Sequence, residues 1–283
     1  MSWSNYACSY VVVHNLHYVR TSLAPSILFF KFRESARIMF ASFFVFIEYW
    51  TILIMSLPSA IRITSKSPTS AIIFFHGLGD TGQGWSWFPQ LVKASKIIPD
   101  AGEGINYVFP NAPEIPITVN GGMKMPAWFN IYGFGDPNAK QDTEGYLKSC
   151  ELVKGFIKEQ MDTYNIPADK IILGGFSQGA AIAYGALATL DIKIGGVIIL
   201  SGFIPVKAEI AKRHLSTNYD TPVFQGHGTM DNIIGYAKGV ETSEYFKALG
   251  FKAVKFNRYV GVAHSASDEE LIDAQNFVKD ILK

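Results

Sequence analysis

The sequence predicts an α/β protein whose mostly parallel, doubly wound sheet is flanked by helices. Short runs that are apolar on both faces alternate with longer segments of helical periodicity, which is the pattern of parallel strands and their covering helices. Glycine-rich turns follow several of these runs, at the points where a strand would pass into a loop. The chain has 283 residues, enough for one large domain with a full core.

Composition and charge exclude several classes of partner and site. Hydrophobic residues make up 48% of the chain and charged residues 17%, and the net charge is +1, so we expect no nucleic acid or other polyanion as a partner. The two cysteines, Cys8 and Cys150, lie far apart and match no disulfide or metal-binding spacing. This pattern fits a reducing compartment.

Residues 1–54 differ from the rest of the chain and are predicted to be an apolar N-terminal extension of a larger domain at residues 55–283. Residues 38–55 are almost continuously apolar, and their number is close to the roughly 20 residues of a membrane-spanning helix. Glu48 near the middle would cost about 2.5–3.5 kcal/mol in lipid. No small-residue cleavage site follows, so we expect no cleaved signal peptide.

Two interpretations of this extension remain open. If residues 38–55 are a membrane anchor, the basic residues before them would stay cytoplasmic and the main domain would lie on the other side. Alternatively, the native protein starts at Met55, and the preceding residues are a translated upstream segment that it lacks.

In the larger domain, the apolar run at 71–75 predicts a buried strand that ends in a glycine-rich loop at 76–84. This loop lacks the lysine of a P-loop, and its glycines do not have the spacing of a dinucleotide-binding fingerprint, so we expect no phosphate site there. A helix is predicted at 85–97 and a second strand at 106–109.

Residues 114–142 show no clear periodicity, and we predict a long irregular loop. Loops of this length are usually functional or disordered, and the many aromatic side chains argue against disorder. Two interpretations remain open. The segment either packs as a small satellite core or forms one wall of an apolar groove, with Trp128 and Phe129 as the lining.

The remaining chain alternates between helix and strand. Apolar residues at helical spacing predict a helix at 143–164. The later elements are predicted to be strands at 171–173, 196–200, 222–225 and 253–259 and helices at 180–190, 236–249 and 267–282. Ser267 and Glu270 have the spacing of a capping box at the start of the last helix.

The motif Gly175-Phe176-Ser177-Gln178-Gly179 lies between a predicted strand and a predicted helix and fits the nucleophile elbow. Small residues are expected on both sides of the serine because a Cβ at either glycine would clash. The turn would place the serine oxygen at a helix N-terminus, where free N–H groups favour a developing negative charge. The alternative interpretation is an ordinary turn with a capping serine.

Three residues follow three different strands in the order Ser177, Asp231, His264, which is the order of an α/β-hydrolase triad. The carboxyl ends of parallel strands meet at one edge of the sheet, where function gathers. We therefore predict the α/β-hydrolase fold, with Ser177 as nucleophile, His264 as base and Asp231 as the group that orients the base. One oxyanion donor is expected to be the N–H of Gln178, and the other the N–H of Leu78.

Other histidines and acids fit these roles less well. His214 lies in a polar stretch and is expected at the surface. His227 is expected to be structural beside the acid loop, and His76 to shape the loop that carries Leu78. Asp220 precedes its strand and would lie at the wrong end of the sheet.

Several motifs together resemble one family more specifically than the elbow alone. They are His76-Gly-Leu-Gly-Asp-Thr-Gly, Pro110-Asn-Ala-Pro, Met125-Pro-Ala-Trp-Phe, Gly174-Gly-Phe-Ser-Gln-Gly-Ala, His227-Gly-Thr-Met-Asp and Ala263-His-Ser. In this order they resemble the acyl-protein thioesterase family, also described as lysophospholipase or carboxylesterase type 2. The resemblance covers about residues 65–282.

The resemblance implies a cytosolic serine hydrolase that removes long acyl chains such as palmitate from protein cysteines, without a metal or cofactor. Its partners would be S-acylated proteins, and some relatives also cleave lysophospholipids and short esters. Membrane contact would be transient unless residues 38–55 are an anchor. An apolar channel for the acyl chain would be lined by Leu78, Trp128, Phe129 and Ile233.

This chain departs from the family pattern at three positions, Asn130, Thr229 and Asn232. These departures bear on substrate preference and remove no catalytic group. Two rival functions remain open. One is a broad carboxylesterase or lysophospholipase with little action on proteins. The other is a catalytically silent acyl-binding module on the same fold.

Overall fold

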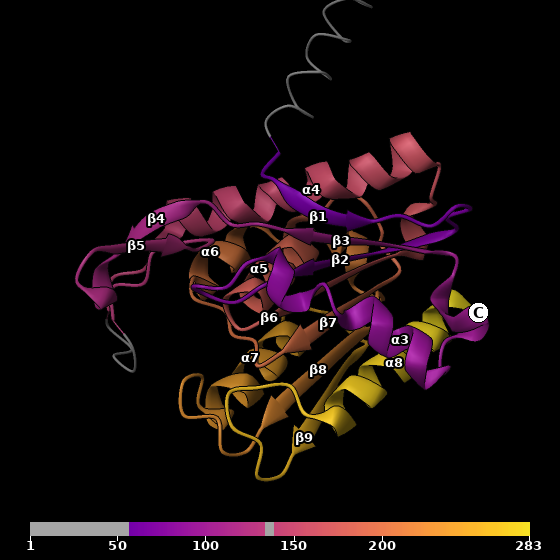
Figure 1. The fold of residues 1–283 in the computed structure, drawn as a ribbon. Coiled ribbons are helices and arrows are strands. Elements are labelled where there is room, and N and C mark those ends of the chain that lie inside the picture. Colours follow the sequence, from indigo (N-terminus) through magenta and orange to yellow (C-terminus); the bar gives the residue numbers. More distant parts are fainter. Residues whose placement is uncertain (1–56, 134–138) are drawn as a thin grey trace, which may run out of the picture. The chain divides into compact units, whose positions relative to one another are not determined.

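The computed structural model describes residues 57–283 with the exception of 134–138. In this part of the chain, one seven-stranded sheet has the order β1-β3-β2-β6-β7-β8-β9 (Figure 1). Its strands are β1 Ala60–Ile63, β2 Ser70–Phe75, β3 Ile105–Pro110, β6 Ile171–Phe176, β7 Gly196–Leu200, β8 Val223–Gly228 and β9 Val254–Tyr259. All neighbouring strands are parallel except β1, which runs antiparallel to β3. The predicted mostly parallel sheet is confirmed, although β1 was not predicted.

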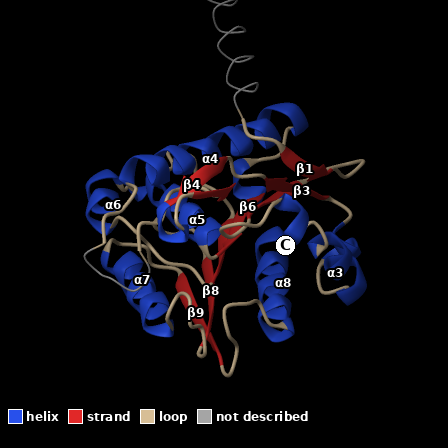
Figure 2. Ribbon diagram, turned by 60° about the vertical axis from the view of Figure 1, so that its left-hand side comes forward, coloured by secondary structure: helices blue, strands red, loops and turns tan. Residues whose placement is uncertain are grey.

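Helices cover both faces of this sheet, as Figure 2 shows. On one face, side chains of α4, α5, α6 and α7 join the larger buried cluster, and on the other face α3 and α8 join the second cluster. The helices are α3 Phe88–Ser95, α4 Thr143–Tyr164, α5 Gln178–Thr189, α6 Lys207–Arg213, α7 Tyr236–Ala248 and α8 Asp268–Leu282. This arrangement explains why the strands are apolar on both faces.

Short 3-10 helices connect several elements. They are η1 Gly82–Trp85, η2 Pro99–Gly102, η3 Thr118–Asn120, η4 Ala168–Lys170 and η5 Ser216–Asn218. The predicted helix at 85–97 is wrong at its start, because α3 begins only at Phe88. Pro89 lacks an N–H and is tolerated in the first turn of a helix, so the chain enters α3 there.

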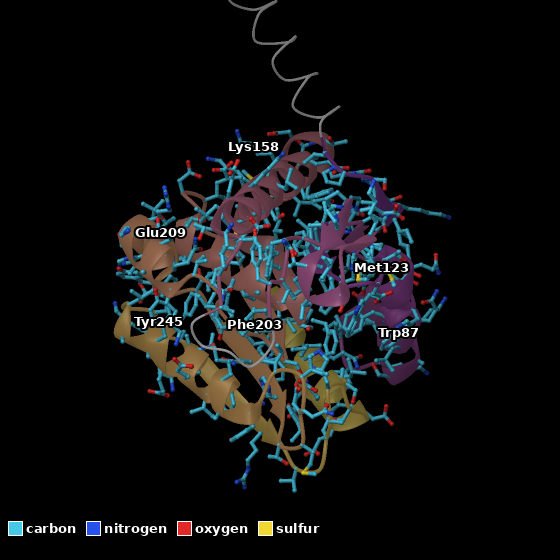
Figure 3. All side chains as sticks on the ribbon, turned by 90° about the vertical axis from the view of Figure 1, so that its left-hand side faces the viewer. Trp87, Met123, Lys158, Phe203, Glu209 and Tyr245 are labelled. Carbon is cyan, nitrogen blue, oxygen red and sulfur yellow. The ribbon has the colours of Figure 1, made fainter. Side chains whose placement is uncertain are left out.

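The segment 114–142 is less irregular than predicted. β4 Glu114–Ile117 and β5 Met123–Pro126 pair as an antiparallel hairpin, joined through η3 and two glycines of positive φ, Gly121 and Gly122. Met123 at the end of the hairpin loop is 65% exposed (Figure 3). The strands are short and contain prolines, so their sequence carries no alternation that would have revealed them.

The predicted capping box of α8 is half formed. The Ser267 hydroxyl accepts a hydrogen bond from the backbone N–H of Glu270 at 3.2 Å. The Glu270 carboxyl does not reach back. The carboxyl is fully buried instead, and neither of its oxygens has a hydrogen-bond partner among the described residues. It packs against Gly226 in β8, where a Cβ would lie 2.1 Å from Glu270 Oε1.

The predicted extension at 1–54 and the apolar segment at 38–55 lie outside the described residues. Within residues 57–283, apart from 134–138, no helix is long and apolar enough to cross a bilayer.

Candidate active site

The elbow between β6 and α5 has the backbone that the motif predicted. Ser177 has φ 54° and ψ −114°, a conformation that L residues rarely adopt. A Cβ on Gly175 would lie 2.4 Å from the carbonyl of Gly179, and a Cβ on Gly179 would lie 2.1 Å from the carbonyl oxygen of Phe75. The need for glycine on both sides of the serine is therefore confirmed. At Gly175 it comes from the close approach of β6 to the start of α5, and at Gly179 from the packing of α5 on β2.

The structure brings Ser177, His264 and Asp231 into one chain of hydrogen bonds. His264 Nδ1 lies 2.8 Å from Asp231 Oδ2, and His264 Nε2 lies 2.9 Å from Ser177 Oγ. A carboxylate only accepts, so Nδ1 carries the ring proton and Nε2 is free to accept the serine proton. Ser177 is the N-cap of α5, but its side chain makes no capping bond. The alternative of a capping serine is therefore wrong.

Asp231 is held so that its charge faces the imidazole. Its side chain is fully buried, and its Oδ1 accepts the backbone N–H groups of Ile233 and Ile234 at 3.0 and 2.8 Å. Burial acts to raise the pKa of this carboxyl, but the hydrogen bonds from His264 and from the two N–H groups outweigh it and lower the pKa. The carboxylate therefore stays ionised at neutral pH and fixes the tautomer of His264.

His227, which lies in β8, occupies a different position. Its Nε2 lies 2.7 Å from the carbonyl oxygen of Ile234 and 3.4 Å from Asp231 Oδ2, and it makes no bond to Ser177. Burial lowers its pKa, so the ring is neutral at pH 7. A Cβ on Gly239 would lie 2.3 Å from His227 Nδ1, so α7 packs directly on the ring. The ring supports the loop that carries Asp231, as predicted from its place in the sequence.

His76 is fully buried at the end of β2 and orders the loop that follows. Its Nε2 accepts the backbone N–H of Ala112 at 3.0 Å, so Nδ1 carries the proton and donates to the Gly77 carbonyl at 2.7 Å. Burial lowers the pKa of this histidine and keeps it neutral. The His214 ring, by contrast, bonds the Ala211 carbonyl through Nδ1 near the surface.

A pocket of about 220 Å³ opens beside Ser177. Its lining consists of Gly77, Leu78, Asp80, Ile131, Phe176, Ser177, Gln178, Phe203, Ile233, Ile234 and His264. Three residues predicted around the substrate, Leu78, Gln178 and Ile233, are among them. The lining is predominantly apolar, with the serine and the imidazole at one side.

Trp128 and Phe129 do not line this pocket, so their predicted role as its wall is wrong. They are 2% and 3% exposed and belong to the larger core cluster. The Trp128 ring packs edge-on against Phe75, and its indole N–H donates to the His76 carbonyl at 2.9 Å. These two aromatics are therefore packing residues, but they belong to the larger core and not to a separate satellite core.

Sequence reasoning missed Ile131 and Phe203 as pocket residues. Phe203 follows the carboxyl end of β7, so the rule that located Asp231 and His264 could have found it. Ile131 gave no such signal, because it lies in a segment with many apolar residues and no periodicity that would show which of them are buried.

Two departures from the family pattern have visible partners. Asn130 accepts the Thr118 N–H at 2.8 Å and donates its amide to the Thr118 hydroxyl at 2.8 Å. The Thr229 hydroxyl accepts the Gly261 N–H at 2.9 Å and so ties the loop of Asp231 to the loop of His264. Neither side chain lines the pocket.

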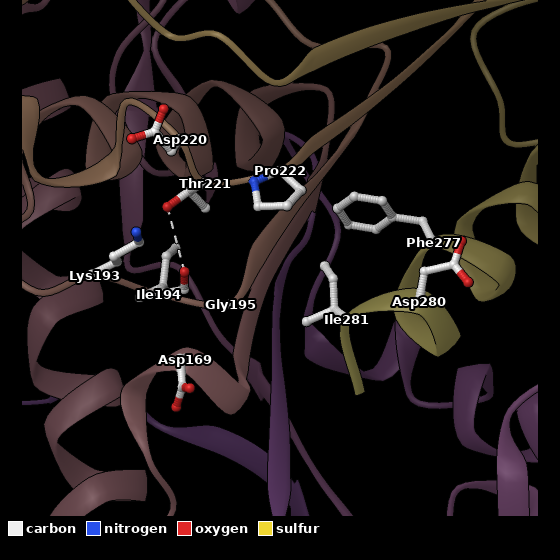
Figure 4. A pocket seen from close by; sticks show the side chains of 10 residues that line it. All are labelled: Asp169, Lys193, Ile194, Gly195, Asp220, Thr221, Pro222, Phe277, Asp280 and Ile281. Carbon is white, nitrogen blue, oxygen red and sulfur yellow. Dashed lines mark hydrogen bonds between the residues drawn. The ribbon is translucent and has the colours of Figure 1, made fainter. Parts of the chain in front are cut away.

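A second pocket, of about 330 Å³, lies at the opposite edge of the sheet, before β6, β7 and β8 begin (Figure 4). Asp220 lines this second pocket, at the end of the sheet where its place before a strand predicted it. None of the predicted site residues lies there.

The comparisons with known proteins agree with this geometry. The sequence model of the phospholipase/carboxylesterase family matches residues 58–282. The chain is 59% identical over 226 residues to acyl-protein thioesterase 1 of Debaryomyces hansenii, covering 79% of this chain and 97% of the relative. It is 59% identical over 230 residues to acyl-protein thioesterase 1 of Candida albicans, covering 80% of this chain and 98% of that relative.

Among solved structures, acyl-protein thioesterase 2 of Zea mays superimposes with a TM-score of 0.68 at 25% identity, covering 80% of this chain and all of that one. The expected resemblance is confirmed by sequence and by fold. A match over the whole described domain, with an elbow that presents Ser177 to His264, leads to one conclusion: the chain is a hydrolase and belongs to the phospholipase/carboxylesterase family of α/β-hydrolases.

Proposed function

We propose that this protein hydrolyses acyl thioesters and removes palmitoyl-type chains from protein cysteines through an acyl-Ser177 intermediate. The observation that carries the proposal is the chain of hydrogen bonds from Asp231 through His264 to Ser177 at the side of an apolar pocket. The high identity to proteins named acyl-protein thioesterase 1 supports the thioester as the substrate. The partners are then S-acylated proteins.

In the first half of the reaction, Ser177 Oγ attacks the carbonyl carbon of the thioester while His264 Nε2 takes the serine proton. Asp231 stabilises the imidazolium that forms. The carbonyl oxygen becomes an oxyanion, and the backbone N–H groups of Leu78 and Gln178 are the proposed donors to it. Both residues line the pocket beside Ser177.

The intermediate then collapses, and the carbon–sulfur bond breaks. His264 returns the proton to the departing cysteine sulfur, and the acyl chain remains on Ser177 as an ester. In the second half, His264 takes a proton from water, the hydroxide attacks the acyl carbon, and Ser177 leaves with the proton. The two half-reactions together consume the thioester and one water, and they require no oxidant or cofactor.

The pocket supports a substrate with an apolar tail. Phe203, Ile131 and Ile233 would contact the first carbons of the chain, and each buried methylene contributes about 0.8 kcal/mol. We place the catalytic domain at residues 55–283, which the family match at 58–282 supports. A cytoplasmic location with transient membrane contact would suit a substrate whose acyl chain rests in a bilayer.

The test compares three substrates on the same protein: an S-octanoyl cysteine peptide, p-nitrophenyl octanoate and a lysophosphatidylcholine. We expect the highest kcat/KM on the thioester peptide, and labelling of Ser177 by a fluorophosphonate probe. A preference for lysophosphatidylcholine would favour the lysophospholipase function. An unlabelled, inactive protein would favour a silent acyl-binding module.

A further inference from the structure

The two proposed oxyanion donors come from segments far apart in the sequence, and Trp128 bonds to both segments. Its indole N–H donates to the carbonyl of His76, two residues before Leu78, at 2.9 Å. Its backbone N–H donates to the side-chain oxygen of Gln178 at 2.8 Å. We call this connection from His76 through Trp128 to Gln178 the Trp128 bridge.

The Gln178 end of the bridge is fixed in orientation. The Gln178 amide uses its oxygen for the Trp128 N–H and its nitrogen for the Phe129 carbonyl at 2.8 Å. Gln178 is 1% exposed, so water does not compete for these groups. Gln178 is also the first residue of α5, and its own N–H has no acceptor within the helix. The side chain therefore fixes the position of the residue whose N–H is the proposed oxyanion donor.

The Leu78 end is fixed by its neighbours' carbonyl and N–H groups. The Gly77 carbonyl accepts from His76 Nδ1 at 2.7 Å, and the Gly79 N–H donates to the Pro126 carbonyl at 2.8 Å. Among the residues that the structure describes, the Leu78 N–H has no acceptor. The peptide units before and after Leu78 are therefore both held by hydrogen bonds. The direction of the Leu78 N–H then depends on the positions of His76 and Gly77.

An oxyanion site requires two donors at about 2.7–3.1 Å from one oxygen position, so the separation of its two segments matters as much as their chemistry. We propose that Trp128 is a positioning residue, which sets the distance between the N–H groups of Leu78 and Gln178 through the Trp128 bridge. The proposal rests on the proposed acyl transfer through Ser177. It gives the buried tryptophan a role in transition-state stabilisation without contact to the substrate.

The first variant is Trp128→Phe, which keeps an aromatic ring in the core and removes the indole N–H. Its matched control is Trp87→Phe, because the Trp87 indole N–H also donates to a carbonyl, that of Gly84 at 2.7 Å, outside the bridge. On p-nitrophenyl acetate we expect kcat of Trp128→Phe to fall about tenfold to a hundredfold, since small misplacements of a catalytic group have effects of this size. The control keeps its kcat.

The second variant, Gln178→Met, removes the other end of the bridge but leaves the backbone N–H of residue 178 in place. It serves if Trp128→Phe does not fold, as judged by circular dichroism. Both variants break the same connection. The fold-loss of kcat in the double variant should therefore be smaller than the product of the fold-losses in the two single variants. Multiplicative losses in folded proteins would contradict a shared bridge.

Binding of hexylboronic acid separates positioning from packing. Ser177 Oγ adds to the boron, His264 takes the proton, and the anionic tetrahedral adduct places an oxygen where the oxyanion forms. We expect its inhibition constant to rise in Trp128→Phe by the same factor as kcat falls, while inhibition by the uncharged hexanamide stays unchanged. Equal loss of both ligands, or unchanged boronate binding, would overturn the Trp128 bridge as a positioning device.

The boronate readout also distinguishes the inference from the proposed function. It requires no turnover, so it reports on the bridge even if the preferred substrate is an oxyester. A wild-type protein that binds no boronate and hydrolyses no ester would overturn the acyl transfer through Ser177, and the inference with it. A normal wild-type protein with an unimpaired Trp128→Phe variant would overturn the inference alone.

Discussion

His264 Nε2 lies 2.9 Å from Ser177 Oγ, although the two residues are 87 positions apart in the sequence. The contact forms because β6 and β9 both end at the same edge of the sheet and each passes into a tight loop there. Phe176 packs against the His264 ring, with centroids 4.8 Å apart, and keeps the imidazole over the serine. The position of the base therefore depends on the packing around the elbow as well as on the Asp231 bond.

The replacement Ser177→Ala should leave the fold intact and lower kcat by about 10⁴-fold or more, as removal of a triad member generally does. The measurement is steady-state hydrolysis of a soluble thioester, with circular dichroism as the check on folding. A folded variant that kept more than about a tenth of the activity would remove Ser177 from the mechanism.

The replacement Asp231→Asn should lower kcat by about 10⁴-fold, because an amide at this position no longer selects the Nδ1–H tautomer of His264. His264→Ala should be similarly inactive. His227→Ala is the comparison, since His227 also approaches Asp231 but does not bond to Ser177. If a folded His227→Ala variant were as inactive as His264→Ala, the choice of base would be wrong.

The buried carboxyl of Glu270 should make stability depend on pH. Burial raises its pKa to about 8, and the charges of Asp231 and Asp273 add to this, whereas the unperturbed value is 4.5. Between these values Glu270 binds more protons in the folded protein than in the unfolded chain, so its contribution to stability is fully present below about pH 4.5 and is lost as the pH rises towards 8. Each tenfold difference in proton affinity is worth about 1.4 kcal/mol, so the total loss is several kcal/mol.

The variant Glu270→Gln tests this dependence, because its amide does not ionise. Urea unfolding at pH 5, 7 and 9 should show the wild type losing stability relative to Glu270→Gln as the pH increases. Glu269→Gln makes the same chemical change on the exposed side of the same helical turn and should behave like the wild type. Parallel pH profiles for wild type and Glu270→Gln would show that Glu270 is ionised in the folded protein.

The apolar pocket should produce a dependence on acyl-chain length. Over the first several carbons, kcat/KM should rise by a few-fold per methylene, corresponding to about 0.8 kcal/mol each, and then level off. Phe203→Ala should flatten this rise and spare acetyl esters, because Phe203 lines the pocket beside Ser177. Leu215→Ala, at an exposed site that does not line the pocket, is the control. Equal losses on acetyl and octanoyl esters would exclude Phe203 from chain binding.

A chain that begins at Met55 should be active, because the residues proposed for the chemistry lie between Gly77 and His264. The expected kcat/KM on a soluble thioester is within about tenfold of the full chain, a difference of less than 1.4 kcal/mol. A greater loss in a folded protein would show that residues 1–54 contribute to the site.

The six parallel strands of the sheet, the elbow and the order of Ser177, Asp231 and His264 could all be predicted from the sequence, whereas β1 could not. Each of these is marked locally, by an apolar run, by two glycines or by a position directly after a strand. The limits of α4, Thr143–Tyr164, also followed from local spacing. The hairpin of β4 and β5 could not be predicted in this way, since its short strands are held by pairing with each other and carry no alternating pattern.

Which apolar side chains face the pocket could not be predicted from the sequence, because it depends on tertiary packing. Trp128 and Ile131 lie three residues apart in one segment of low periodicity, yet Trp128 is buried against Phe75 and Ile131 lines the pocket. Burial direction outside a helix or strand depends on partners from distant elements, here β2 and α5, which local sequence does not contain. The Trp128 bridge is invisible in the sequence for the same reason, because its hydrogen bonds join residues about 50 positions apart.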